Sequence, residues 1–153
     1  MSEKNNINIC WLRRDLRLDD NAALYHALKA ENPVLVVFIL DKNILDKLEN
    51  KADARVDFIH QQLSKINDQL IDKGSSLLVK YDTPENAWQQ IIRDFKVSTV
   101  YTNHDYEPYA RKRDERISEL LEKNGIAFHT FKDQVIFEKG EVKKADGTPY
   151  TVF

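Results

Sequence analysis

Five short apolar runs are spaced along the chain, and each has a length suited to one β-strand. They occupy residues 7–12, 34–40, 77–81, 97–102 and 126–131. The second run, VLVVFIL, is apolar throughout, which is typical of a strand covered on both faces. The sequence therefore predicts a sheet whose strands lie inside the molecule.

The segments between these runs have the period of α-helices. Apolar side chains recur at alternating steps of three and four residues at Val56, Ile59, Leu63, Ile66 and Leu70. This stripe predicts a long helix that ends at Gly74. Thr83 supplies an N-cap and Pro84 the first residue of another helix, and a further helix is predicted over residues 108–124, just before Gly125.

Helices that alternate with five strands predict an α/β fold: an open, mostly parallel, five-stranded Rossmann-like sheet with helices on both faces. The 153 residues leave room for one domain. Ligands of such sheets bind at the carboxyl ends of the strands, near the point where strand order reverses. Those ends are residues 13–15, 41–43, 81–82 and 103–107.

The composition limits the classes of function. The 23 basic and 25 acidic residues give a net charge of -2, so the chain lacks the basic excess of a protein that binds nucleic acid by itself. None of the four glycines follows the first strand, which excludes a dinucleotide fingerprint or a P-loop there. The four histidines lack metal-ligand spacing, so we expect no metal site.

Two further absences concern the cellular setting. The only cysteine, Cys10, cannot form an internal disulfide and is expected to be a small buried hydrophobic residue. The N-terminal residues are polar, and no apolar run approaches the length of a membrane span. We therefore expect a cytoplasmic protein with no membrane contact.

The most highly charged segment follows the first predicted strand directly. Residues 11–21 read WLRRDLRLDDN and hold three arginines and three aspartates. One interpretation is a salt-bridged loop that caps the next helix through Asp20. The other interpretation is a family signature.

A second polar segment, HDYEPY at residues 104–109, ends the fourth predicted strand. One interpretation is a loop that begins a helix with Pro108 at its first position. The other is the edge of a ligand site, where the carboxylates of Asp105 and Glu107 accept hydrogen bonds from a ligand and aromatic rings supply contact area. Arg55, at the start of the long helix, would form either a surface ion pair or a contact to an anionic group.

Five stretches of the chain, in order, resemble the DNA photolyase/cryptochrome family. They are WLRRDLRLDDN at 11–21, FILDKNIL at 38–45, ARVDFI at 54–59, YEPYARKRD at 106–114 and GTPYTVF at 147–153. Together they span essentially the whole chain, which is identified on this basis as a member of that family.

The resemblance implies that residues 1–135 are the family's N-terminal α/β antenna domain and that residues 136–153 begin the connection to a helical domain. In the family, the antenna domain holds a light-harvesting chromophore and passes its energy to FAD in the helical domain, which also binds damaged DNA and repairs pyrimidine dimers. We therefore expect an excised, monomeric antenna domain with no catalytic residues, no FAD site and no repair activity of its own.

Two alternatives remain open. A cryptochrome with a signalling role would share these residues, because the positions that discriminate it lie in the helical domain. An adenine-nucleotide-binding, universal-stress-like module would have a similar sheet, but it would need a glycine-rich phosphate loop late in the chain, and residues 131–140 do not supply one.

The resemblance also bears on the chromophore. Folate-binding members have an Asn-Glu pair where this chain has Tyr109 and Ala110, which argues against a folate. Members that bind 8-hydroxy-5-deazaflavin or FMN are more similar to the chain at residues 40–45 and 105–109. The residues implied to bind the chromophore are Phe38, Leu40, Asp41, Asn43, Ile44, Leu45, Arg55, Asp105 and Glu107.

Within this set the resemblance implies distinct roles. Asp105 and Glu107 would hydrogen-bond a tricyclic ring, apolar side chains of residues 38–45 would wall it, and Arg55 would help to hold its polar tail. The Arg13, Asp15 and Arg17 cluster is interpreted as architectural, with charges that pair with one another and with the helix start at Asp20.

Overall fold

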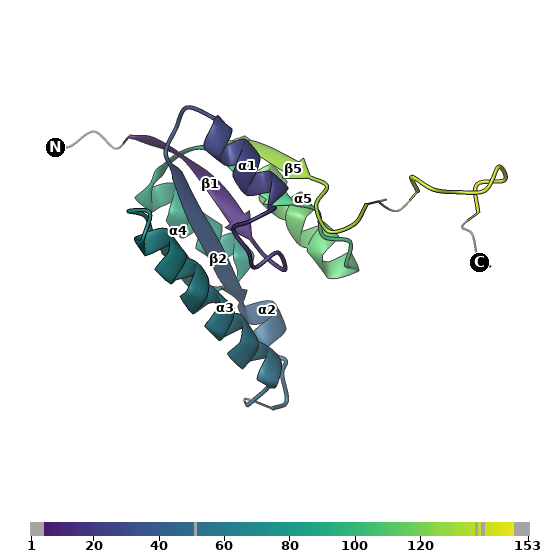
Figure 1. Cartoon of the computed structure of the whole chain (residues 1–153), viewed down its shortest axis with the longest axis horizontal. Helices are drawn as coiled ribbons and strands as arrows, with labels where there is room; N and C mark the ends of the chain where they lie inside the picture. The colour runs from purple at the N-terminus through teal and green to yellow at the C-terminus, as the bar shows by residue number, and fades with distance from the viewer. Residues whose placement is uncertain (1–4, 51, 137, 139, 149–153) are drawn as a thin grey trace.

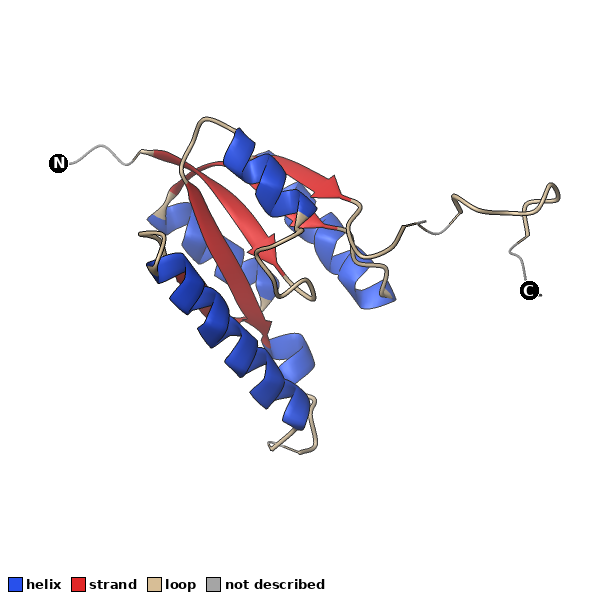
Figure 2. Ribbon diagram, viewed as in Figure 1, coloured by secondary structure: helices blue, strands red, loops and turns tan. Residues whose placement is uncertain are grey.

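The computed structural model describes residues 5–50, 52–136, 138 and 140–148 (Figures 1 and 2). The strands are β1 (Asn6–Leu12), β2 (Val34–Asp41), β3 (Leu77–Asp82), β4 (Lys96–Asn103) and β5 (Ala127–Phe131). The helices are α1 (Ala22–Lys29), α2 (Lys42–Leu45), α3 (Ala54–Ile71), α4 (Pro84–Asp94) and α5 (Pro108–Lys123).

The strands form one parallel sheet in the order β3-β2-β1-β4-β5. The predicted open α/β sheet is therefore confirmed, with every strand pair parallel. Strand order reverses between β1 and β4, because the chain first adds β2 and β3 on one side of β1 and then β4 and β5 on the other. A ligand crevice is expected at the carboxyl ends of the strands near this reversal.

Helices cover both faces of the sheet, as Figure 2 shows. On one face Trp88 and Ile91 of α4 and Ile117 of α5 pack against β-strand residues that include Trp11. On the other face α1 and α3 pack against residues that include Cys10, which is fully buried as predicted. Burial on both faces explains the apolar runs of the inner strands β1 and β2, whereas the edge strands β3 and β5 are only partly buried.

The start of α1 differs from the prediction. The N-cap is Asn21, whose side chain accepts a hydrogen bond from the backbone N–H of Leu24 at 3.1 Å. Asp20 instead has a φ of 48°, in the left-handed region, and is exposed. The tight turn at Asp20 brings the next residue into the extended conformation that an N-cap requires, so the prediction was wrong by one position.

The short helix α2 was not predicted. Asp41, the last residue of β2, caps it by accepting a hydrogen bond from the backbone N–H of Asn43 at 2.9 Å. A single helical turn of four residues is too short to produce a hydrophobic period. Its effect is to fold residues 42–45 back over the end of the sheet.

The segment after β5 contains no helix or strand among its described residues. Turns are closed by backbone hydrogen bonds from Glu141 to Glu138 at 3.0 Å and from Gly147 to Lys144 at 2.9 Å. The GTPYTVF stretch lies outside the described residues from position 149 onward, as does residue 139 of the predicted first turn. None of the described helices has the length and apolar character needed to cross a membrane.

Candidate functional site: a cavity at the carboxyl ends of β1 and β2

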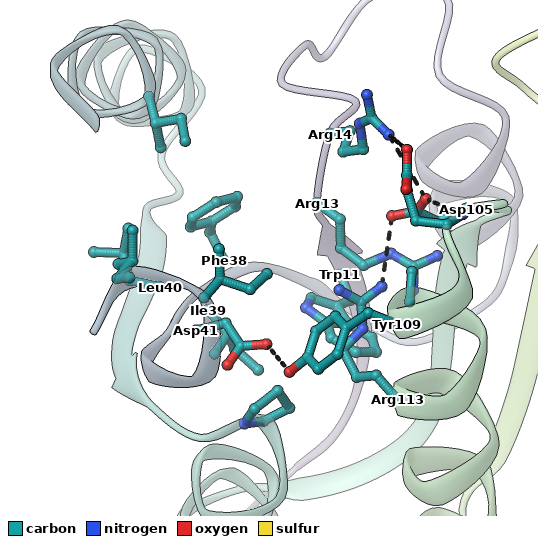
Figure 3. A pocket seen from close by; sticks show the side chains of 16 residues that line it. Trp11, Arg13, Arg14, Phe38, Ile39, Leu40, Asp41, Asp105, Tyr109 and Arg113 are labelled. Carbon is teal, nitrogen blue, oxygen red and sulfur yellow. Dashed lines mark hydrogen bonds and ion pairs between the residues drawn. The ribbon is translucent and has the colours of Figure 1, made fainter. Parts of the chain in front are cut away.

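A cavity of about 230 Å³ opens at the carboxyl ends of β1 and β2, between α2, α3 and α5 (Figure 3). It lies beside the reversal of strand order, where the fold predicts a ligand site. The residues that line it are Trp11, Arg13, Arg14, Phe38, Ile39, Leu40, Asp41, Ile44, Leu45, Ile59, Pro84, Asp105, Glu107, Tyr109, Ala110 and Arg113. The site is therefore built from five separate segments of the chain.

One wall of the cavity is apolar. It is formed by Phe38, Leu40, Ile44, Leu45 and Ile59. Phe38 is nearly buried at 7% exposure, whereas Ile44 on α2 is 47% exposed and marks the rim. A flat aromatic or conjugated ring can pack against this wall, and the burial of both apolar surfaces from water would favour binding.

A hydrogen-bonded pair closes the cavity between β2 and α5. The hydroxyl of Tyr109 donates to Asp41 Oδ2 at 2.6 Å, and Asn43 Nδ2 donates to the same hydroxyl at 3.3 Å. Partial burial together with the neighbouring Asp41 carboxylate raises the pKa of Tyr109 to about 12. Tyr109 therefore stays protonated at neutral pH and fixes the distance between the two elements.

The opposite wall is polar. The carboxylate of Asp105, at 6% side-chain exposure, lies 3.8 Å from Arg113 Nη2 and 4.0 Å from Arg14 Nη1. Glu107 pairs with Arg14 at 3.2 Å, and both of these side chains are more than half exposed. The polar wall thus has a buried part, Asp105 with Arg113, and an exposed rim, Arg14 with Glu107 (Figure 3).

Trp11 forms part of the cavity surface between two cations. Its ring lies 4.9 Å from the guanidinium carbon of Arg13 and 5.2 Å from that of Arg113, and it meets Trp88 edge-on at 5.3 Å. These cation–π contacts hold both guanidinium groups in place beside the ring.

Next to the cavity, Asp15 is the centre of a buried hydrogen-bond network. Its carboxylate accepts from the backbone N–H of Arg13 at 2.9 Å, from Asn21 Nδ2 at 3.1 Å and from Asn103 Nδ2 at 2.7 Å. Asp15 is 5% exposed and does not line the cavity. The network ties the ends of β1 and β4 to the start of α1.

The arginines of this segment pair at longer range than predicted. The guanidinium of Arg13 donates to Asp114 and to the backbone carbonyl of Asn103. Arg17 donates to Asp133 at 2.6 Å, and only its second bond, to the Asp20 carbonyl at 2.8 Å, stays within the segment. The expectation that these side chains pair with one another was wrong, because the arginines find partners on β4, on α5 and in the chain after β5. The expected contact with Asp20 is present, through Arg17.

The side chains of the HDYEPY segment (residues 104–109) contact two different parts of the molecule. Asp105, Glu107 and Tyr109 line the cavity, whereas His104 and Tyr106 both contact Glu138, at 2.6 and 2.8 Å. Partial desolvation and this hydrogen bond raise the pKa of Tyr106 to about 12. Residues 105, 107 and 109 thus line the cavity, whereas residues 104 and 106 contact the chain that follows β5.

Seven of the nine residues implied by the resemblance line the cavity: Phe38, Leu40, Asp41, Ile44, Leu45, Asp105 and Glu107. Asn43 and Arg55 are not among the described lining residues. Asn43 acts through its bond to Tyr109, and Arg55, 78% exposed in its side chain, forms an ion pair with Asp53 at 2.5 Å. Its assignment to a ligand's polar tail stays a prediction.

The cavity also has lining residues that were not assigned to it from the sequence: Trp11, Arg13, Arg14, Ile39, Ile59, Pro84, Ala110 and Arg113. Tyr109, Ala110 and Arg113 face the cavity together because steps of three and four residues share one helix face. Arg113 also falls in the buried stripe of α5, with Ala110, Ile117 and Leu121. The sequence signal that could have identified Arg113 is its position as a charged residue in the apolar stripe of the helix.

Comparisons with known proteins agree with this fold. The family model for DNA photolyase matches residues 8–153. A deoxyribodipyrimidine photo-lyase of Alkalihalophilus pseudofirmus is 33% identical over 158 residues, covering 100% of this chain and 32% of that protein. The chain thus spans about a third of the photolyases that it matches.

Two solved structures have the same fold. An archaeal photolyase from Sulfolobus tokodaii, with two FAD molecules, has a TM-score of 0.79 and 34% identity over 88% of this chain and 32% of its own. A class III photolyase from Agrobacterium tumefaciens has a TM-score of 0.84 and 28% identity over 99% of this chain and 31% of its own. The chain belongs to the photolyase/cryptochrome family and corresponds to its N-terminal domain.

Proposed function

We propose that the chain is the light-harvesting domain of a deoxyribodipyrimidine photolyase and that its cavity holds the ring system of an antenna chromophore, 8-hydroxy-5-deazaflavin or FMN. The chromophore passes its excitation energy to FAD in the part of the protein outside this chain, where damaged DNA is bound and repaired. The observation that carries the proposal is the division of the cavity into an apolar wall and a polar wall that contains Asp105 and Arg113.

A planar conjugated ring with one polar edge matches this division. Its faces contact apolar side chains, while its N–H and carbonyl groups meet the buried polar pair. The volume of about 230 Å³ is smaller than the roughly 300 Å³ at which sites for whole drug-sized ligands begin. The ring alone would therefore occupy the cavity, with its polar tail at the exposed rim near Ile44 and Glu107.

Two observations favour a tricyclic ligand over a folate. At the positions where folate-binding members carry an Asn-Glu pair, the Tyr109 hydroxyl donates to Asp41 and the small Ala110 is 2% exposed. Ala110 leaves space that a longer side chain would fill. In addition, the Sulfolobus tokodaii photolyase contains two FAD molecules, described as implicating a novel light-harvesting cofactor, which supports a flavin ring as a suitable antenna.

The experiment that tests the proposal is an absorption spectrum of the purified chain after incubation with FMN, 8-hydroxy-5-deazaflavin or a reduced folate, followed by desalting. We expect a shifted, structured visible band to stay with the protein for at least one of the two tricyclic ligands and not for the folate. Retention of the folate alone, or of none of the three, would contradict the proposal.

A further inference from the structure

Arg113 occupies a position that an α5 core residue would ordinarily fill. It falls in the buried stripe with Ala110, Ile117 and Leu121, and it is 8% exposed. Charged side chains are rarely this buried unless their donors are satisfied by partners. The relevant question is which groups satisfy this guanidinium.

Only part of the guanidinium has a hydrogen-bond partner. Its Nε donates to Asp114 Oδ1 at 3.0 Å. Its Nη2 lies 3.8 Å from Asp105 Oδ2, which is too long for a hydrogen bond although it retains an electrostatic attraction. Within the part of the chain that the structure describes, Nη2 is a buried atom with no hydrogen-bond partner.

Arg13 provides a contrast within the same site. Both of its terminal nitrogens are engaged, one by Asp114 and the other by the carbonyl of Asn103. Each terminal nitrogen of Arg13 therefore has a hydrogen-bond partner in the protein, whereas Nη2 of Arg113 has none among the described residues. Since buried donors are almost always satisfied, an unsatisfied one at a cavity wall points to an acceptor that comes from a ligand.

The surroundings of Arg113 define that acceptor. Its guanidinium is held over the Trp11 ring at 5.2 Å and stands beside the buried carboxylate of Asp105 on the polar wall (Figure 3). The wall therefore presents a cationic N–H donor next to an anionic acceptor. The complementary ligand edge has an acceptor oxygen next to an N–H, which is the pattern of a cyclic amide or imide.

We propose that Arg113 is a specificity-determining residue that donates a hydrogen bond from Nη2 to a carbonyl oxygen of the ligand ring while Asp105 accepts from the adjacent ring N–H. The pair selects planar rings with a cyclic amide or imide edge over rings of similar shape that lack one. This inference rests on the proposed function, because it concerns the ligand of the same cavity.

The test measures the dissociation constants of two tricyclic ligands without a polar tail. Lumiflavin has the imide edge, and acridine, which is uncharged at slightly alkaline pH, has neither the carbonyl nor the N–H. For the unmodified chain we expect lumiflavin to bind at least about tenfold more tightly than acridine, the scale of one charge-assisted hydrogen bond. Arg113→Met should remove this preference, while binding of acridine changes little.

Arg111→Met is the matched control, because Arg111 lies on the same helix but is exposed and does not line the cavity. It should keep the full preference for lumiflavin. If Arg113→Met fails to fold, Arg113→Lys serves as the second variant: it keeps the positive charge at this position but lacks Nη2, and it should reduce the preference for lumiflavin. Equal affinities for lumiflavin and acridine would overturn this inference and leave the proposed function standing, whereas binding of neither ring would overturn both.

Discussion

Two polar clusters lie side by side at the carboxyl ends of β1 and β4, and they differ in how completely the protein satisfies them. The carboxylate of Asp15 accepts three hydrogen bonds at 2.7–3.1 Å from Arg13, Asn21 and Asn103. The guanidinium of Arg113 keeps one buried nitrogen without a hydrogen-bond partner among the described residues. Both groups are more than nine-tenths buried, so exposure alone does not separate them.

This difference distinguishes a cluster that stabilises the fold from one that is available to bind a ligand. A saturated network has nothing left to offer a ligand, and its contribution is to fix the ends of strands and the start of a helix. An unsaturated group beside an apolar wall is destabilising until an acceptor enters, which is why we propose that the ligand binds beside Arg113. The comparison can be tested by changing one side at a time and measuring stability and binding separately.

The largest effect is expected for Asp15→Ala. The substitution leaves three donors around a buried site without their acceptor, and we expect the free energy of unfolding to fall by about 3 kcal/mol. Urea denaturation measures this change. Flavin affinity, measured on the fraction that remains folded, should be unchanged because Asp15 does not line the cavity.

Asp19→Ala is the control for that experiment, because Asp19 belongs to the same charged segment but is exposed. Its effect on the unfolding free energy should stay below about 0.5 kcal/mol. The separation between the clusters would be refuted if Asp15→Ala kept its stability and lost flavin affinity.

A slightly smaller effect is expected on the binding side for Ile59→Trp. Ile59 is half-buried on α3 and lines the apolar wall, so a tryptophan there occupies space meant for the ligand ring. We expect flavin affinity to fall by about 100-fold, equivalent to roughly 2.7 kcal/mol. The free energy of unfolding should change by less than about 1 kcal/mol, since the new side chain enters an open cavity rather than a filled core.

The neighbouring substitution Phe58→Trp controls for placing a large aromatic residue on α3, because Phe58 is 59% exposed and does not line the cavity. Titration of protein fluorescence against FMN distinguishes the two variants. Equal affinity in both would mean that the ligand lies elsewhere.

The sheet could be predicted from the sequence because the burial of a strand produces a run of neighbouring apolar residues, which is visible in the sequence itself. Burial on both faces favours apolar runs, most clearly in β1 and β2, and all five predicted runs fall on strands, with bounds that differ by at most one residue at every end. The capping residue of α1 was misplaced because Asp20 and Asn21 both have suitable side chains. The choice between them depends on a backbone turn that side-chain preferences do not determine.

The cavity was only partly predictable, for a different reason. Its strand-end residues, such as Asp41 and Asp105, follow from topology, because parallel strands end at one edge. Arg113 could have been noticed as a charge in an apolar stripe, but its missing hydrogen bond depends on distances between three elements. The long-range partners of Arg13 and Arg17 likewise arise only when distant segments meet.

The smallest effect is expected for Tyr109→Phe, which removes the bond between α5 and Asp41 at the cavity wall. We expect a loss of about 1 kcal/mol in unfolding free energy at neutral pH, the usual contribution of one hydrogen bond. The folded-state pKa of Tyr109, about 12, lies above the ordinary value of about 10 for tyrosine. Its contribution to stability is therefore fully present below about pH 10 and is lost as the pH rises toward 12.

Urea denaturation across this pH range should show that the unmodified chain loses its stability advantage over Tyr109→Phe. Tyr25→Phe is the control for removing one phenol hydroxyl, because Tyr25 lies on the exposed face of α1. An advantage that stays constant up to pH 12 would mean that Tyr109 does not hold the cavity wall through its protonated hydroxyl.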